Sequence, residues 1–435
     1  GKSYTRPDMP LPARLDTLTQ DTASIGDLSW WKLYNDTTLQ QLIHRALTYN
    51  KDLKIASARM NELAALKRVD FANMFPQATA RLNGNRETTN YGGDNFDADS
   101  ELSLTASISW ELDLWGNLRW ARDRSTAEFL ASVENCRAVK MGLVAQVAQS
   151  YFELMALDNE LAIVRRTLEA RREGVRLAEI RFKGGLTSEI VFQQAKVELA
   201  KTATMVPDLE RRISLKESEI ALLTGDFPYA VNRNILPEEI QLPDALPLGL
   251  PSTLLERRPD IRKAERELMA AHAEVGLAYT NMFPRLALTA TLGTESETLR
   301  DFLKSPYSYL AGNLLSPLFA MGKNRAALKA KRAAYEGAVA EYEQTVLTAF
   351  KETHDAIINF NKIKDIYESR RQLAEASRTA VELAQLQYIN GVIGYLDLLD
   401  AQRNYFDAQV SLSNAVCNKQ LMIINLYKAL GGGWK

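Results

Sequence analysis

An internal duplication constrains the fold of this 435-residue chain more than any other feature. Asn73-Met74-Phe75-Pro76 recurs as Asn281-Met282-Phe283-Pro284, at an offset of 208 residues. Gly185 and Gly225 recur as Gly391 and Gly431, at an offset of 206. Because a nearly constant offset over more than a hundred residues is very improbable by chance, the chain consists of two copies of one structural unit of about 206 residues.

Proline marks the boundary between the copies, since it lacks an N–H group and is excluded from helix interiors and central strands. Five of the 14 prolines fall between residues 226 and 251. The predicted organisation is an N-terminal extended arm (1–35), a first repeat (36–225) with a β-hairpin (77–112) and a long helical hairpin (119–225), a Pro-rich linker (226–251), and a second repeat (252–435) with a β-hairpin (285–317) and a long helical hairpin (324–430).

Each copy changes its hydrophobic period in the same order. Residues 36–75 have the 3- and 4-residue spacing of a helix, and 252–283 are its copy. Apolar and polar residues then alternate strictly over 101–112, a length of strand that crosses a bilayer when tilted. Residues 77–88 form its weaker partner, and 285–317 repeat the pattern. We therefore predict four strands per chain.

The helical patterns that follow are unusually long. Residues 119–183 and 324–389 keep mostly 3- and 4-residue spacing, which at 1.5 Å per residue corresponds to roughly 95 Å. Glycine-containing turns, 184–188 and 390–394, then reverse the chain into helices of about 36 residues. Helices of this length need lateral partners, and coiled-coil spacing supplies them. A mixed α and β fold with a long α-helical coiled-coil barrel follows.

The composition excludes several function classes. The 53 basic residues are balanced by 54 acidic ones, which argues against nucleic acid as a partner. The three His residues are scattered and the glycine clusters follow helices instead of strands, so we expect no enzyme activity, no cofactor and no metal site. No run reaches the roughly 18 apolar residues of a spanning helix, which leaves a transmembrane β-barrel open.

Four strands are too few to close a sheet, and hydrocarbon does not tolerate an open edge. Oligomerisation is therefore expected. Three chains would supply twelve strands, an even number within the range of known barrels. Two or four chains would also give even numbers, so the residues alone leave the stoichiometry open.

At this point the sequence resembles the TolC-type outer-membrane factors, in the lipoprotein branch that serves tripartite multidrug efflux systems of the RND type. The resemblance covers nearly the whole chain in order. It rests on Trp110-Glu111-Leu112-Asp113-Leu114-Trp115-Gly116, Leu254-Leu255-Glu256-Arg257-Arg258-Pro259-Asp260-Ile261, Pro317-Leu318-Phe319, Leu398-Leu399-Asp400-Ala401-Gln402-Arg403 and Leu426-Tyr427-Lys428-Ala429-Leu430-Gly431.

The resemblance implies a homotrimer in the outer membrane of a Gram-negative bacterium, with a 12-stranded β-barrel continuous with an α-helical periplasmic tunnel. It implies a passive exit duct whose partners are a periplasmic adaptor protein, an inner-membrane RND-type transporter and outer-membrane lipid. Tyr4-Thr5-Arg6-Pro7 resembles the arm that follows a lipidated Cys, which would precede Gly1. Type I protein secretion and metal efflux are alternative duct functions, and a soluble coiled-coil scaffold is an alternative of another class.

The duplication also points to a constriction. At an offset of 206, Val191, Gln194 and Val197 correspond to Asp397, Asp400 and Arg403, so charge occurs in one copy only. Leu396, Asp400 and Arg403 can share one helical face. An ordinary exposed ion pair is the alternative interpretation. The resemblance implies that Leu396, Asp400 and Arg403 form the periplasmic gate and that Asp397 and Asp400 contribute acidic rings, which would favour cations.

Two further sets of candidate residues come from the turns and the strand ends. The turns are the candidate adaptor-docking tips, although simple helix caps would have the same residues; they consist of Gly184, Gly185, Leu186, Thr187, Ser188, Asn390, Gly391, Val392, Ile393 and Gly394. Aromatic residues near the strand ends are either membrane-interface anchors or plain packing. They are Trp110, Trp115, Tyr307, Tyr309 and Phe319.

Overall fold

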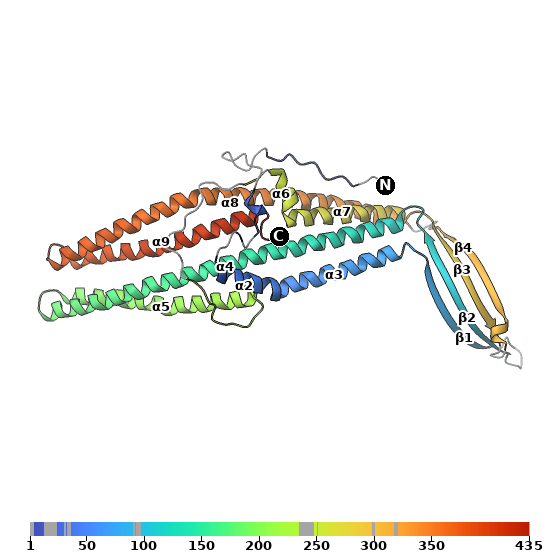
Figure 1. Cartoon of the computed structure of the whole chain (residues 1–435), viewed down its shortest axis with the longest axis horizontal. Helices are drawn as coiled ribbons and strands as arrows, with labels where there is room; N and C mark the ends of the chain where they lie inside the picture. The colour runs from blue at the N-terminus through green and yellow to red at the C-terminus, as the bar shows by residue number, and fades with distance from the viewer. Residues whose placement is uncertain are drawn as a thin grey trace. The chain divides into compact units, whose positions relative to one another are not determined.

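The computed structural model describes residues 4–12, 24–29, 32, 36–89, 92, 97–234, 248–249, 251–297, 301–316 and 321–434. Parts of the predicted arm and most of the predicted linker, including 235–247, therefore lie outside the described residues. The chain divides into two compact units. Figure 1 labels its helices and strands. Unit 1 comprises residues 1–9, 58–134 and 262–345, and unit 2 comprises 10–57, 135–261 and 346–435.

Unit 1 contains one antiparallel sheet in the order β1-β2-β3-β4 (Figure 1). Its strands are β1 (Gln77–Thr89), β2 (Asp97–Leu112), β3 (Arg285–Ser296) and β4 (Pro306–Leu315). The prediction of four strands is confirmed. In addition, β2 of the first copy pairs with β3 of the second, with Leu112 opposite Leu286. The two expected hairpins are thus joined into a single sheet.

The register gives this sheet one apolar and one polar face. One row of paired residues consists of Ala78, Ile108, Ala290 and Leu310. The next row, which points to the other face, consists of Thr79, Ser107, Thr291 and Tyr309. Apolar side chains of the first face are exposed, Ile108 by 54% and Leu310 by 81%. An exposed apolar face of this extent marks a surface that contacts a partner or a membrane.

Long helical hairpins have the same dimensions in the two copies. In the first, α4 (Asn117–Lys183) has 67 residues and α5 (Glu189–Leu223) has 35. In the second, α8 (Lys323–Ile389) has 67 residues and α9 (Tyr395–Ala429) has 35. None of the helices in the described part of the chain combines the length and the apolar composition of a membrane-spanning helix.

The predicted continuous helices over 36–75 and 252–283 are wrong, because each is divided in two. The first divides at Asn50 into α2 (Thr37–Tyr49) and α3 (Lys51–Ala72). The Asn50 amide donates to the carbonyl of Leu223 at 3.0 Å, and its side-chain oxygen accepts from the N–H of Leu53 at 3.0 Å. Asn50 therefore begins α3 and ties this junction to the end of α5.

The second copy divides into α6 (Pro251–Arg257) and α7 (Pro259–Thr280). Pro259 disfavours helical geometry at Arg258 and then begins the next helix. The buried Arg258 guanidinium donates to the carbonyl of Ala429 at 3.2 Å. In both copies the end of the returning helix, α5 or α9, thus contacts the break between the two helices that precede the β-hairpin.

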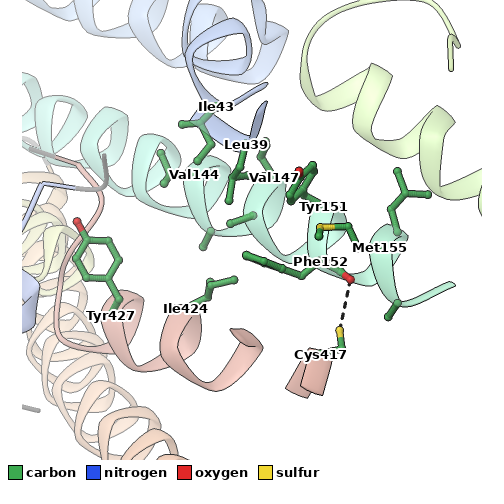
Figure 2. Packing of buried hydrophobic residues seen from close by; sticks show 14 of the residues in the cluster. Leu39, Ile43, Val144, Val147, Tyr151, Phe152, Met155, Cys417, Ile424 and Tyr427 are labelled. Carbon is green, nitrogen blue, oxygen red and sulfur yellow. Dashed lines mark hydrogen bonds between the residues drawn. The ribbon is translucent and has the colours of Figure 1, made fainter. Parts of the chain in front are cut away.

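Unit 2 is held together by an apolar core to which both copies contribute. Figure 2 shows Leu39 and Ile43 of α2 facing Val147 and Tyr151 of α4, with Ile424 of α9 in the same cluster. Tyr151 donates from its hydroxyl to Asp36 Oδ2 at 2.7 Å, and Asp36 also accepts from the first N–H groups of α2. Burial raises the pKa of Tyr151, which keeps this hydroxyl a donor.

Candidate functional site

The turns of the two helical hairpins have the same backbone geometry. Gly185 has φ +69° and Gly391 has φ +74°, values that favour glycine. The N–H of Leu186 donates to the carbonyl of Arg181 at 2.8 Å, and that of Val392 to Gln387 at 2.8 Å. These six-residue hydrogen bonds define Schellman motifs, which end α4 and α8 at equivalent positions.

The predicted docking residues are therefore brought together at two matched turns, and each turn exposes an apolar side chain. Leu186 is 74% exposed and Val392 is 70% exposed. The two turns differ at the start of the next helix. Asp397 Oδ2 accepts from the N–H of Gly394 at 3.1 Å and caps α9, whereas Ser188 makes no side-chain cap on α5.

Next to the turns, a small apolar cluster joins the two hairpins. It consists of Ala178 of α4, Ala195 of α5 and Tyr395 and Leu399 of α9. The Phe182 and Phe192 rings stack with centroids 6.0 Å apart, and Arg181 lies over the Tyr388 ring at 4.7 Å. The apolar packing fixes the spacing of the helices on which the charged candidates lie.

A buried carboxylate beside this cluster connects the copies. Glu198 of α5 forms an ion pair with Arg403 of α9, and its side chain is only 7% exposed. Arg171 of α4 is also 7% exposed, and its Nη2 lies 3.9 Å from Glu198 Oε2. Arg171 donates from Nη1 to Gln402 Oε1 at 2.6 Å. The first-copy residues Arg171 and Glu198 are thus linked to Gln402 and Arg403 of the second copy.

The ionisation of these groups follows from their contacts. The hydrogen bond from Arg403 holds the pKa of Glu198 below its ordinary value, and Glu198 raises the pKa of Arg403 in return. Burial lowers the pKa of Arg171, because Glu198 only partly compensates for the lost solvent. Glu198 is therefore anionic and lies beside three cations. They are Arg403, Arg171 and Lys201, whose Nζ is 3.3 Å from Glu198 Oε1.

The four predicted gate residues occupy different surroundings on α9. Leu396 and Arg403 line a groove of about 490 Å³ between α5 and α9, and Leu396 is 60% exposed. Asp397 caps its own helix. Asp400 is exposed and accepts from the side-chain amide of Asn404 at 3.3 Å. The structure brings Leu396 and Arg403 together with α5, and leaves Asp400 at the surface of the protomer.

Glu198 and Arg171 were not among the predicted site residues, although the sequence contains a signal for both. Arg171 interrupts the apolar spacing of Leu168 and Val175, and Glu198 follows Ala195 at the three-residue spacing of the same helical face. Two opposite charges at core positions of a helical hairpin indicate a buried pair. The described residues contain no group of three or more His, Cys, Asp or Glu side chains that could hold a metal ion.

The predicted interface aromatics divide between the faces of the sheet. Trp110 lies on the apolar face and donates from Nε1 to the carbonyl of Met74 at 3.1 Å. Trp115 donates to the carbonyl of Pro284 at 2.8 Å and stacks on Phe283. Tyr309 pairs with Thr291 on the polar face. Tyr307 pairs with Gly293 on that face, and Phe319 lies outside the described residues.

An exposed apolar sheet, paired long helical hairpins and charge beside one hairpin turn define the class of outer-membrane channel proteins. The family model described as outer membrane efflux protein matches residues 42–226 and 250–432. The chain therefore belongs to the outer membrane efflux protein family, as the resemblance implied. It is the outer-membrane duct of a tripartite efflux system and not an enzyme, and it resides in the outer membrane of a Gram-negative bacterium.

Individual relatives agree with this assignment. Outer membrane protein OprJ of Pseudomonas aeruginosa is 32% identical over 448 residues, covering 99% of this chain and 92% of OprJ. Cation efflux system protein CusC of Escherichia coli is 29% identical over 443 residues, covering 99% of this chain and 95% of CusC. The solved outer-membrane channel OprN is 30% identical with a TM-score of 0.89, covering 99% of both chains. The soluble-scaffold alternative is therefore wrong.

Proposed function

We propose that three copies of the chain assemble around one axis and that residues of α9 form the constriction of the resulting duct. Those residues are Leu396, Asp397, Asp400 and Arg403. Within the described sheet, β1 and β4 each have one neighbouring strand, so each protomer offers two edges for pairing. Three protomers would join these edges into a closed twelve-stranded sheet whose exposed apolar face contacts lipid.

The ion pair between Arg403 and Glu198 is the observation that carries the proposed gate. It connects the charged helix of the second copy to a buried carboxylate of the first. A constriction made of α9 can widen only if this contact breaks or moves with the helix. The pair therefore links the position of α9 to that of α5, and the exposed carboxylate of Asp400 would face the axis of the proposed trimer.

Ion conductance in planar bilayers tests this gate. The variant carries Asp397→Asn and Asp400→Asn, because Asn keeps the size of each side chain and removes its charge. We expect the preference for cations to fall, since three protomers would lose six carboxylates at a narrow point. The matched control is Asp407→Asn, an exposed carboxylate two turns further along α9. An equal cation preference in both variants would remove Asp397 and Asp400 from the gate.

We propose that a periplasmic adaptor docks at the two hairpin turns, 184–188 and 390–394. The exposed side chains of Leu186 and Val392 support this proposal, because the fixed turns present them without further ordering of the backbone. An inner-membrane RND-type transporter would supply the energy and select the cargo. Leu186→Ser with Val392→Ser should weaken adaptor capture in pull-down assays, while Thr379→Ala on the exposed surface of α8 should not.

Trp110 and Trp115 are proposed as membrane-interface anchors, since both lie where the strands meet the helices of unit 1.

We also propose a lipid on a Cys preceding Gly1. The support is that residues 4–6 of the N-terminal arm are held in place by side-chain contacts. Arg6 donates to both oxygens of Glu265, at 2.6 and 2.8 Å, and the Tyr4 ring contacts His272. Mass spectrometry of the protein isolated from membranes would show the added acyl mass, and an unmodified N-terminus would refute the lipid.

For cargo we propose small organic molecules. The ten Met residues form no clustered pairs, which disfavours a copper or silver pathway along the duct. Metal efflux and type I protein secretion remain the competing assignments, and CusC, a relative named for cation efflux, is similar over nearly the whole chain. Deleting the gene should lower the minimum inhibitory concentration of lipophilic drugs and leave silver tolerance unchanged. The opposite result would favour metal efflux.

A further inference from the structure

Unit 2 contains a second cavity near the charged network, and no part of the proposed gate uses it. Its volume is about 370 Å³, at the lower end of the roughly 300–1,000 Å³ typical of small-molecule sites. The cavity lies between α4, α8 and α9. Its lining consists of Arg166, Thr167, Ala170, Arg171, Val381, Gln385, Gln402, Tyr405, Phe406 and Gln409.

All the charged side chains that line this cavity are cationic. Two guanidinium groups, three side-chain amides and one phenol are present, and no Asp or Glu lines the cavity. The Arg166 side chain is exposed and has no carboxylate partner within the described part of the chain. Gln409 donates from Nε2 to the Tyr405 hydroxyl at 3.0 Å, which leaves the hydroxyl proton available to a ligand.

One hydrogen-bond donor of the Arg171 guanidinium has no partner among the described residues of the protein. Its side chain is only 7% exposed, and its Nε–H group is buried without a hydrogen-bond partner among the described residues. Its nearest carboxylate, Glu198, is 3.9 Å away and is shared with Arg403 and Lys201. A buried cation with a missing hydrogen bond is costly, so an anion that reaches it gains a charge-assisted contact. The lowered pKa of Arg171 agrees with this deficit.

We propose that this cavity binds a small amphiphilic organic anion, namely a single-ring carboxylate or sulfonate. Arg171 and Arg166 pair with the anionic group, and the amides of Gln385 and Gln402 together with Tyr405 supply further polar contacts. Phe406, Val381 and Ala170 provide an apolar wall for the ring. Because α4 belongs to the first copy and α8 and α9 to the second, the bound anion connects the two helical hairpins of one protomer.

The volume and the lining set the ligand class. About 370 Å³ accommodates one ring with its anionic group and excludes a large amphiphile such as a whole lipid. A free inorganic anion would satisfy the arginines and leave the wall formed by Phe406 and Val381 without contacts. A neutral aromatic molecule would fill the wall and leave Arg171 unpaired. The combination of both features selects an aromatic anion.

Fluorine NMR with the full-length protein in detergent tests the proposal, with 4-fluorobenzoate as the probe and 4-fluorobenzamide as its neutral analogue. Saturable line broadening of the benzoate beyond that in empty micelles is the expected result. Arg166→Gln should weaken binding about tenfold, since it removes one charge-assisted contact. Gln385→Glu should weaken it at least as much, because it adds a carboxylate to the lining.

The matched control is Arg165→Gln, the neighbouring arginine on α4, which is 59% exposed and pairs with Glu210 outside the cavity. It makes the same charge change and should leave the affinity within about twofold, as expected for a screened charge. Arg166 and Gln385 are both exposed, so their variants should fold, and circular dichroism checks this. Binding no stronger than to empty micelles, equal effects of the two arginine variants, or equal binding of the amide would each overturn the proposal.

Discussion

The two helical hairpins have the same scaffold and different charges. Both consist of a 67-residue and a 35-residue helix joined through a Schellman turn. At matched positions after the turn, however, α5 has Val191, Gln194 and Val197, whereas α9 has Asp397, Asp400 and Arg403. Both copies thus have the same helix geometry, and substitutions at a few positions give helices of equal length different charges and therefore different functions.

In the charged network beside the turns, the buried charges show the reverse distribution. Arg171 and Glu198 belong to the first copy, and their counterparts at an offset of 206 are Ser377 and Asn404. The carboxylate of one copy is therefore matched with a guanidinium of the other. The copies are coupled through this asymmetry, since two identical hairpins would place like charges opposite each other.

The largest effect is expected from Glu198→Gln, which breaks the coupling between the copies. Removing the carboxylate leaves Arg171 buried without a counter-charge, a change that costs about 3 kcal/mol. The free energy of unfolding, measured by urea titration with circular dichroism at 222 nm, should fall by about this amount.

Glu210→Gln is the control for that measurement, because Glu210 lies on the same helix and is 51% exposed in its pair with Arg165. Its cost should stay within about 0.5 kcal/mol. If both variants unfold at the same urea concentration, the Glu198 contact does not couple the hairpins.

A second variant makes the copies more alike. Val191→Asp with Gln194→Asp gives α5 the acidic residues of α9, and in the proposed trimer this doubles the carboxylates near the constriction. Cation preference in planar bilayers should rise by about twofold, since each added charge attracts cations at short range. Glu189→Gln with Gln193→Glu, which leaves the net charge of α5 unchanged, serves as the control. Unchanged selectivity in the acidic variant would mean that α5 does not face the duct.

The long helices and the four strands could be predicted because each is a periodic pattern longer than chance would produce. Alternation over 101–112 and 3- and 4-residue spacing over 119–183 lie within β2 and α4. The breaks at Asn50 and Arg258 were missed although each has a local signal, the capping residue Asn50 itself and Pro259 after Arg258. What the local spacing does not contain is the tertiary contact at each break, namely the hydrogen bonds from Asn50 to Leu223 and from Arg258 to Ala429.

The candidate site was predictable only in part. Aligning the two repeats identified Asp397, Asp400 and Arg403, because the matched positions of the first copy are uncharged. Glu198 was missed, since its core position is visible in the helical spacing but its partner, Arg403 of a distant helix, is not. Tyr307 and Tyr309 were candidate membrane anchors by residue type, with plain packing as the alternative, and the strand register places both on the polar face.

The turns offer a smaller difference between the copies. Asp397 caps α9 by accepting from Gly394, and Val191 at the matched position of α5 cannot do so. Asp397→Ala should therefore cost about 1 kcal/mol of helix stability. Val191→Ala removes no cap and should cost clearly less, because Val191 is only partly buried. Urea unfolding of both variants makes the comparison, and equal costs would show that the cap contributes nothing.

The smallest expected effect is a pH dependence confined to the contact between copies. The pKa of Glu198 is lowered by Arg403 from an ordinary value of about 4.5. Its contribution to stability is therefore complete above about pH 4.5 and is lost as the pH falls further, through the folded-state pKa. Because Arg403 is 47% exposed, solvent screens part of this contact, so the pH-dependent part should be smaller than the full cost of Glu198→Gln.

Comparing the native chain with Glu198→Gln isolates that contribution, because all other carboxylates titrate in both proteins. The difference in unfolding free energy between them should be constant from about pH 7 to pH 5 and should shrink below about pH 4.5. A difference that stays constant into acid would mean that Glu198 binds its proton equally in the folded and unfolded states. The hairpins would then be held together by the apolar cluster around Leu399 and Ala195, and the charge divergence between the copies would serve the gate alone.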